Sequence, residues 1–167
     1  NGKTQLAAAL GVFHLIADDA DTAPVVVCAA GDRQQARLLF DMARGMIQHS
    51  PELAAVCQVY RNEIRCHRNS GTFRVLSADA GAQQGLNPTM VIIDEACGVS
   101  EEIDTAVDSI LSGDHSRLLR IGNPTNAATP FGTAFRQQRG KRFAVSAFDT
   151  PNFTSAGITM DSIRSGE

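Results

Sequence analysis

Residues 25–30, Val-Val-Val-Cys-Ala-Ala, constrain the fold of this chain more than any other segment. The run is apolar without interruption and begins with three β-branched side chains, whereas a strand with one face in water alternates apolar and polar residues. It therefore predicts a strand that is buried on both faces, which is typical of a parallel sheet covered by helices on either side. Gly31 ends this strand, and a second apolar strand is expected over residues 90–94.

Helical and strand patterns alternate along the chain. Apolar residues at three- and four-residue spacing predict a first helix over 4–17 that buries Leu6, Leu10, Phe13 and Ile16. The other expected helices are 32–48, 101–111 and 130–138, and the expected strands are 25–30, 59–66, 72–76, 90–94, 117–121 and 143–148. This βαβα order predicts an α/β fold of three layers with a mostly parallel sheet.

Two local signals refine that order. Asp32 is a suitable N-cap for the second helix, because its side chain can accept hydrogen bonds from the first helical N–H groups. Arg68-Asn69-Ser70-Gly71 is rich in turn-forming residues and separates two short strands, which predicts a β-hairpin.

Composition excludes several classes of protein. The 167 residues are 43% hydrophobic, which is enough for one domain with a single core, and no apolar run approaches the roughly 20 residues of a membrane span. A net charge of -3 gives no overall signature of nucleic-acid binding, and 5% aromatic residues are poor material for stacking single-stranded bases. The four cysteines lack metal-binding spacing, so we expect free thiols in a soluble, cytosolic protein.

The residues Asn1-Gly2-Lys3-Thr4-Gln5, at the start of the first predicted helix, are typical of the end of a phosphate-binding P-loop. Glycine allows backbone N–H groups to approach phosphates, lysine reaches the β- and γ-phosphate oxygens, and the threonine hydroxyl binds Mg²⁺. The first glycine of the full motif would precede residue 1, and a Gly-Lys-Thr tripeptide also occurs by chance. The segment therefore needs a second element before it predicts an ATP site.

The pair Asp94-Glu95 supplies that second element. An acidic residue at the carboxyl end of a buried strand faces the ligand crevice of an open α/β sheet. Asp94 is therefore a candidate Mg²⁺ ligand, and Glu95 is the candidate general base for the attacking water. The alternative is an ordinary solvated strand end at which Glu95 only caps the next helix.

Gly122-Asn123 follows the next predicted strand, so Asn123 is a candidate sensor of the γ-phosphate. The alternative is a turn chosen for its backbone angles. Two basic clusters are candidate contacts with DNA phosphates, although such clusters are usually solvated faces. The candidate residues are Arg61, Arg65 and Arg68 in the hairpin region and Arg136, Arg139, Lys141 and Arg142 after the last helix.

Together these segments resemble the ATPase domain of the large terminase subunit of tailed bacteriophages. The segments that carry the likeness are Asn1–Thr4, Arg33–Ala36, Gly85–Pro88 leading into Val91–Ala96, Ile121–Pro124 and Phe148–Asn152. They span nearly the whole chain. Helicases of the DEAD type would show Ser-Ala-Thr where this chain has Gly-Asn-Pro, so the likeness is closer to terminases.

The resemblance implies a P-loop NTPase fold of the RecA-like ASCE class and the hydrolysis of ATP, with Mg²⁺, to move double-stranded DNA into a procapsid. It also implies a portal protein and a small terminase subunit as partners, a homo-oligomeric ring, and a location in the host cytoplasm without membrane contact. On this basis we expect residues 1–150 to form the ATPase core and residues 151–167 to begin a linker toward a nuclease domain that the sequence does not contain.

In related sheets the P-loop strand is central and lies beside the strand expected near residues 118–121. The P-loop strand itself is missing from this sequence, so the resemblance implies that its neighbours have unpaired edges. We therefore expect residues 1–167 alone to bind ATP poorly, to aggregate and to lack activity.

Two alternatives stay open at this level. The first is a helicase or another P-loop motor that acts on DNA, which would carry a second P-loop-like domain in place of a nuclease. The second is a module that binds nucleotide or DNA without turnover. Release of phosphate that depends on Lys3 and Glu95 would exclude such a module.

Overall fold

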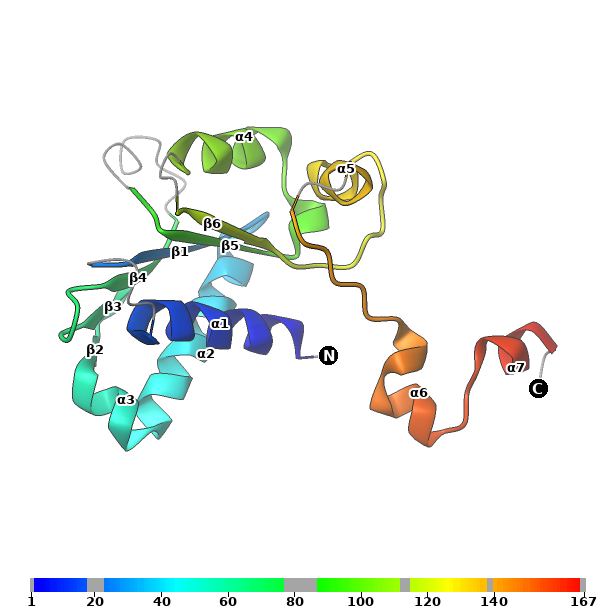
Figure 1. Cartoon of the computed structure of the whole chain (residues 1–167), viewed down its shortest axis with the longest axis horizontal. Coiled ribbons are helices and arrows are strands. Elements are labelled where there is room, and N and C mark those ends of the chain that lie inside the picture. Colours follow the sequence, from blue (N-terminus) through cyan, green and yellow to red (C-terminus); the bar gives the residue numbers. More distant parts are fainter. Residues whose placement is uncertain (1, 18–22, 77–86, 112–114, 138–139, 166–167) are drawn as a thin grey trace. The chain divides into compact units, whose positions relative to one another are not determined.

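The computed structural model describes residues 2–17, 23–76, 87–111, 115–137 and 140–165 (Figure 1). The α-helices are α1 (Lys3–Ala17), α2 (Arg33–His49), α3 (Pro51–Val56), α4 (Glu101–Ile110), α5 (Pro130–Arg136), α6 (Pro151–Ser155) and α7 (Met160–Ser165). The strands are β1 (Val25–Ala30), β2 (Cys57–Val59), β3 (Glu63–Cys66), β4 (Thr72–Val75), β5 (Met90–Asp94) and β6 (Arg117–Arg120). Short 3₁₀ helices are η2 (Ala96–Gly98) and η3 (Ala147–Asp149).

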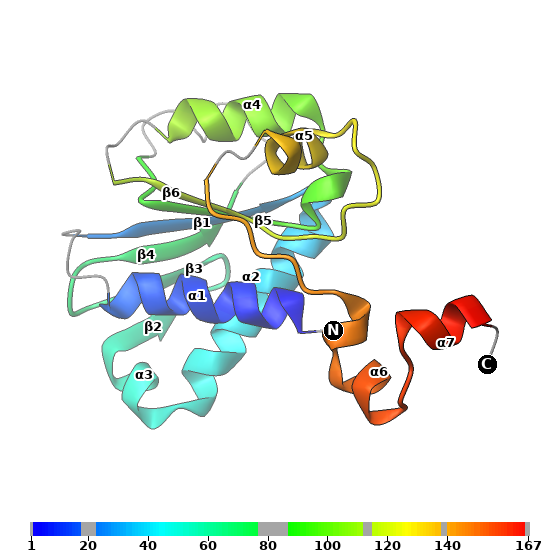
Figure 2. The same cartoon turned by 45° about the vertical axis from the view of Figure 1, so that its right-hand side comes forward.

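The strands form one six-stranded sheet in the order β2-β3-β4-β1-β5-β6. The pairs β1–β4, β1–β5 and β5–β6 are parallel, while β2–β3 and β3–β4 are antiparallel. Helices α1 and α2 cover one face of the sheet and α4 covers the other (Figures 1 and 2). The predicted three-layer α/β fold with a mostly parallel sheet is therefore confirmed.

The central strands β1 and β5 are buried on both faces, as their apolar runs predict. Alternate residues of β5 enter different clusters: Met90 and Ile92 pack with α1 and α2, whereas Val91 and Ile93 pack on the side of α4. Asp94, the last residue of β5, continues the first of these sets. Its side chain is therefore directed toward the layer that contains α1.

The predicted buried face of α1 is wrong for three of its four residues. Leu6, Leu10 and Phe13 are 56%, 40% and 65% exposed, whereas Ile16 is partly buried and packs against the core. The buried residues of α1 are Ala7, Ala8, Gly11, Val12, His14 and Leu15. Ala7, Ala8 and Gly11 are small, so the helix axis can approach the sheet closely.

Gly11 marks the closest approach. A Cβ atom added there would lie 2.5 Å from Phe73 Cε2 and 2.8 Å from Ile92 Cδ1. We therefore expect Gly11→Ala to reduce the free energy of unfolding by about 1–3 kcal/mol, the usual cost of overpacking a core. The measurement is chemical denaturation of the protein that contains this chain.

Gly45, in α2, is the matched control for Gly11, because a Cβ atom added there meets nothing within 4 Å. Gly45→Ala should stabilise the protein by about 0.5–1 kcal/mol, since alanine is the better helix former. Equal effects of the two substitutions would contradict the close packing of α1 on the sheet.

A buried polar link holds α1 over the sheet. His14 Nε2 lies 2.8 Å from Thr89 Oγ1, and His14 Nδ1 lies 2.8 Å from Arg117 Nη1. Because a guanidinium can only donate, Nδ1 accepts this bond and Nε2 carries the proton that is donated to Thr89. The imidazole is therefore neutral and ties α1 to the residue before β5 and to the first residue of β6.

The predicted strand 59–66 is in fact two strands. β2 and β3 are antiparallel and are joined by a tight turn, in which Tyr60 N donates to Glu63 O at 2.7 Å. The predicted hairpin between β3 and β4 is confirmed. Helix α3 was not predicted, although its start is marked by Ser50, which caps the N–H of Leu53, and by Pro51 at the first helical position.

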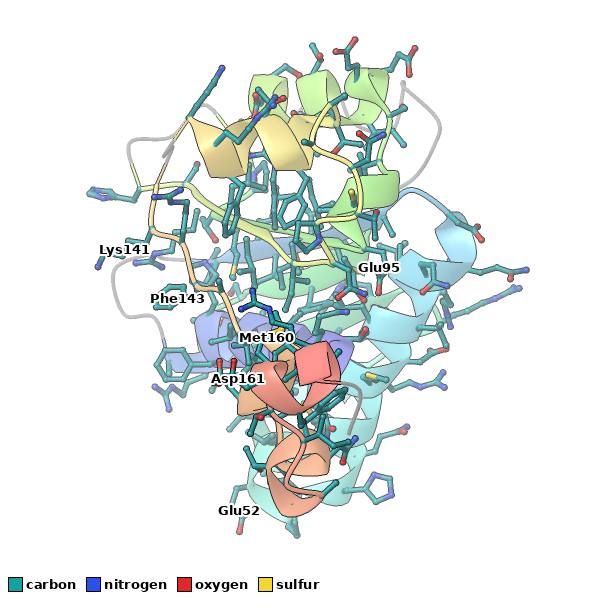
Figure 3. The ribbon with its side chains drawn as sticks, turned by 90° about the vertical axis from the view of Figure 1, so that its right-hand side faces the viewer. Glu52, Glu95, Lys141, Phe143, Met160 and Asp161 are labelled. Atoms are coloured by element: carbon teal, nitrogen blue, oxygen red, sulfur yellow. The ribbon has the colours of Figure 1, made fainter. Side chains whose placement is uncertain are left out.

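The predicted strand 143–148 is wrong. No strand forms there, and Phe143 and Val145 are 85% and 78% exposed (Figure 3). A mostly apolar segment becomes a strand only when a neighbouring backbone completes the hydrogen bonds, and no described strand pairs with this one.

The chain gathers into two compact units, residues 1–133 and 134–167. In the second unit Arg142 donates to Phe135 O at 2.7 Å, and Phe148 packs edge-on against Phe153 with ring centroids 5.5 Å apart. The core boundary expected at residue 150 stays a prediction. No helix within the described residues combines the length and apolar composition that a membrane crossing requires.

Candidate active site

The first part of the site joins α1 to β5. The hydroxyl of Thr4, in the first turn of α1, donates to Asp94 Oδ2 at 2.6 Å. Asp94 is fully buried, and its other carboxylate oxygen accepts from the backbone N–H of Glu95 at 3.0 Å. Asp94 and His14 are the two buried polar side chains in the described part of the chain, and the carboxylate is held by directed hydrogen bonds.

Glu95, labelled in Figure 3, directly follows β5. Its backbone is left-handed, with φ 46° and ψ 47°. This conformation is costly for a residue with a Cβ atom and is concentrated at functional sites. Glu95 occupies the N-cap position of η2, but its side chain makes no capping hydrogen bond. The alternative that Glu95 serves only as a helix cap is therefore not supported.

The third part of the site is the set of contacts that Lys3 makes with Asn123 and Glu95. Lys3 Nζ donates to Asn123 Oδ1 at 2.9 Å and lies 3.8 Å from Glu95 Oε1. Because lysine can only donate, the amide oxygen of Asn123 faces Lys3, and the amide nitrogen is then the group that could donate to a phosphate oxygen. Three separate segments of sequence thus converge on one ammonium group.

The strand ends that carry Glu95 and Asn123 are fastened to each other. Ala96 N donates to Ile121 O at 3.0 Å, and a Cβ atom at Gly122 would lie 3.0 Å from Ala96 N. Gly122 is not among the residues with positive φ. The glycine is therefore required for close approach of the two segments rather than for a special backbone angle.

Sequence reasoning missed one residue of this region, Cys97 in η2. Thr125 Oγ1 donates to its Sγ at 3.2 Å, Thr129 Oγ1 lies 3.5 Å from Sγ, and the thiol reaches Asn126 O at 3.7 Å. The thiol thereby ties the Glu95 turn to the loop after Asn123. No spacing rule signals this contact, because it depends on the path of a loop.

The same hydroxyl groups of Thr125 and Thr129 lower the pKa of the Cys97 thiol to about 7. The thiolate therefore forms at lower pH than in an ordinary cysteine. We expect the rate of alkylation of Cys97 by iodoacetamide to rise about tenfold per pH unit below pH 7 and to level off above about pH 8. Quenched mass spectrometry at several pH values measures this rate.

Thr125→Val is the informative variant for this prediction. Removing its hydroxyl should move the midpoint of the alkylation profile to higher pH. Cys28 lies fully buried in the central strand β1 and should stay unlabelled in the native protein, which provides an internal control. A wild-type profile that still rises tenfold per unit between pH 8 and 9 would contradict the lowered pKa.

The basic residues of the hairpin region do not form one patch. Arg61 and Arg68 lie beyond opposite ends of β3. Arg65 pairs with Glu63 and its guanidinium stacks on the Tyr60 ring at 5.2 Å. Arg74 also pairs with Glu63, at 2.8 Å, so this carboxylate neutralises part of the positive charge.

The second basic cluster belongs to the second unit. Arg136, Lys141 and Arg142 are exposed, and the Arg142 guanidinium lies 5.5 Å from the centroid of the Phe135 ring. Arg139 lies outside the described residues. Asn1 and most of the segment Gly81–Pro88 lie outside them as well, while Gly2 and Gln5 are exposed at the start of α1.

The residues present fit a phosphate and a magnesium ion. Gly2 has φ 69°, which a glycine adopts freely, and it directly precedes the N-terminus of α1, where backbone N–H groups attract anions. A hydroxyl and a buried carboxylate 2.6 Å apart, Thr4 and Asp94, are hard oxygen donors of the kind that Mg²⁺ prefers.

Comparison with known proteins is consistent with this site. The family model described as "Terminase large subunit, ATPase domain" matches residues 1–120. The large subunit of the terminase of Enterobacteria phage HK97 is 30% identical over 135 residues, which cover 77% of this chain and 26% of that protein. The chain therefore spans about a quarter of this relative.

Solved structures show the same fold. The HK97 large terminase matches with a TM-score of 0.71 at 24% identity and covers 83% of this chain and 31% of its own. The ATPase domain of the Thermus phage P74-26 large terminase gives 0.65 at 22% identity, with 90% and 65% covered. The large terminase of a thermophilic bacteriophage, solved in complex with ATP-gamma-S, gives 0.61 at 16% identity, with 83% and 34% covered.

Proposed function

The chain belongs to the family of terminase large subunit ATPase domains, and from this we propose that it hydrolyses ATP to drive double-stranded viral DNA into a procapsid. The observation that carries the proposal is the convergence of Lys3, Thr4, Asp94, Glu95 and Asn123 from three segments of the sequence. The large terminase of the thermophilic bacteriophage, solved with ATP-gamma-S, supports ATP as the nucleotide.

In the proposed reaction, the N–H groups that follow Gly2 and the Lys3 ammonium bind the phosphates. Thr4 and Asp94 would hold Mg²⁺, which would supply positive charge to stabilise the phosphates. Glu95 orients the attacking water and accepts its proton. Its carboxylate is exposed enough to contact a water molecule and lies 3.8 Å from Lys3, beside the proposed phosphate site. Lys3 stabilises the negative charge that develops on the transferred phosphoryl group.

Asn123 is proposed as the sensor of the γ-phosphate. The Lys3 ammonium carries three N–H donors, so one can bind a phosphate oxygen while another stays on Asn123 Oδ1 at 2.9 Å, which links Asn123 directly to the phosphate. The loop after Asn123 is fastened to the Glu95 turn through Cys97 and Thr125. A change at the phosphate is therefore transmitted to residues 123–129 by direct contacts.

The wider role is proposed on the family alone. Its partners would be double-stranded DNA, a portal protein, a small terminase subunit and further copies of the chain in a ring, in the host cytoplasm. The proposed DNA contacts are Arg61, Arg65, Arg68, Arg136, Arg139, Lys141 and Arg142. Arg65 is already paired with Glu63, which makes it the weaker candidate within the hairpin region.

The test of the proposed function uses the full-length protein that contains this chain. We expect release of phosphate from ATP that depends on Mg²⁺ and is stimulated by linear duplex DNA, together with protection of that DNA from nuclease inside procapsids. A helicase would instead separate the strands of a partial duplex, and a module without turnover would bind ATP and release no phosphate. Either of these results would replace the proposal.

A further inference from the structure

Two cysteines face each other across the antiparallel end of the sheet, remote from the ATP site in the strand order. Cys57, the first residue of β2, is the direct partner of Cys66, the last residue of β3. Both side chains belong to the cluster that packs with α1 and α2, and they are 6% and 1% exposed. Opposite residues of an antiparallel pair project from the same face of the sheet.

The hydrogen-bond pattern defines the spacing of this pair. His67 N donates to Val56 O at 2.8 Å, and Tyr60 N donates to Glu63 O at 2.7 Å. Hydrogen-bonded and non-hydrogen-bonded pairs alternate along antiparallel strands, so Cys57 and Cys66 form a non-hydrogen-bonded pair. The Cα atoms of such pairs are about 4.5 Å apart, which lies at the short end of the range of about 4.4–6.8 Å that a disulfide requires.

The thiols of Cys57 and Cys66 are neighbours, since burial and the nearby Cys66 thiol together raise the pKa of the Cys57 thiol. The thiol of Cys28 instead reaches the carbonyl oxygens of Ala36 and Arg74, each at 3.5 Å. Cys97 contacts the loop at residues 125–129. The geometry therefore singles out one of the possible pairings.

We propose that Cys57 and Cys66 are a dithiol site that a low-molecular-weight disulfide, such as glutathione disulfide, oxidises to a cross-strand disulfide. The thiolate of Cys57 attacks one sulfur of glutathione disulfide, whose S–S bond breaks and releases one glutathione thiolate. The thiolate of Cys66 then attacks the Cys57 sulfur and releases the second. Two electrons pass to glutathione disulfide, and the two protons of the protein thiols go to the released glutathione.

Access to these sulfurs sets the rate. β2 has three residues and is the outermost strand at its end of the described sheet, so it can open locally without unfolding of the central strands. Burial raises the pKa of the Cys57 thiol to about 12. The closed pair therefore stays protonated, and because the opened Cys57 thiol has the ordinary cysteine pKa of about 8.5, the oxidation rate should rise from pH 7 and level off above about pH 8.5.

The test uses the native full-length protein with excess glutathione disulfide, followed by N-ethylmaleimide in denaturant and tryptic mapping. Trypsin cleaves after Arg44, Arg61, Arg65 and Arg68, so the disulfide joins peptide 45–61 to peptide 66–68. We expect this linked peptide to contain most of Cys57 at completion and to disappear after reduction with dithiothreitol. Recovery of Cys57 and Cys66 as separate maleimide or glutathione adducts would overturn the proposal.

Three variants serve as controls. Cys57→Ser and Cys66→Ser should each abolish the linked peptide, whereas Cys97→Ser should form it at the wild-type rate. Loss of the linked peptide in Cys97→Ser would mean that glutathione disulfide reacts first with Cys97, which then passes the disulfide on. That result would overturn direct oxidation of Cys57 and Cys66. The presence or absence of the linked peptide in the wild-type digest decides the proposal even if a serine variant fails to fold. This measurement does not depend on ATP hydrolysis, so it is separate from the test of the proposed function.

Discussion

Glu95→Gln should lower kcat for ATP hydrolysis by about 10²–10⁴-fold while ATP still binds. The substitution keeps the shape of the side chain but removes its ability to accept a proton from water, which is the usual contribution of a general base. Steady-state phosphate release and the ATP dissociation constant, measured on the full-length protein, check the two parts of this expectation.

The size of the effect separates catalysis from charge pairing. Glu95 lies 3.8 Å from Lys3, and the two side chains are 47% and 25% exposed. An ion pair this exposed contributes at most about 1 kcal/mol, or about fivefold in an equilibrium constant. A fall of a hundredfold or more therefore has to come from the chemical step.

Glu52 provides the matched control for Glu95. It is an exposed carboxylate in the first turn of α3, where it accepts a hydrogen bond from Ser50 Oγ at 2.8 Å (Figure 3). Glu52→Gln makes the same chemical change away from the site and should leave kcat within about twofold of wild type. Unchanged turnover in Glu95→Gln would remove Glu95 from the role of base.

Lys3→Ala should lower kcat by about 10²–10³-fold and also weaken ATP binding. The Lys3 ammonium group contacts both Asn123 and Glu95 at the start of α1, where the phosphates are proposed to bind. Loss of a single preorganised donor to the transition state typically costs a factor of this size. Because lysine contributes to the ground state as well, kcat and the dissociation constant should both change.

Arg44→Ala is a suitable control for Lys3→Ala, because it removes a cation that pairs with Asp41 on α2 at 3.3 Å. Its turnover and ATP affinity should match those of wild type. The Lys3 assignment would fail if Lys3→Ala lost less than tenfold in kcat/KM while Glu95→Gln lost a hundredfold or more. The site would then bind phosphate through backbone N–H groups alone.

Much of the site was predictable because parallel strands place their carboxyl ends at one edge of the sheet. Asp94 ends β5, and Asn123 follows β6, its parallel neighbour. Once the apolar runs predict parallel strands, the convergence of these residues follows from topology. The position of Lys3 and Thr4 opposite them follows in the same way from a helix that packs on that sheet.

Other features depended on contacts that no local pattern records. Helical spacing in α1 fits more than one buried face, and the close approach at Gly11 places the face of Ala7, Ala8 and Gly11 on the sheet. The apolar composition of residues 143–148 fits a strand, but no neighbouring backbone in the described residues completes it. The periodicity of a segment indicates which residues share a face. Packing against other elements decides which face is buried.

The sequence by itself determined the α/β architecture and the residue types of the site, because burial on both faces and the chemistry of phosphate binding restrict composition locally. The tertiary structure alone decided the left-handed backbone of Glu95, the Lys3–Asn123 contact, the Cys97 link and the pairing of Cys57 with Cys66. Each of these depends on how distant segments meet in space, and that arrangement is set by the packing of the whole sheet rather than by neighbours in the chain.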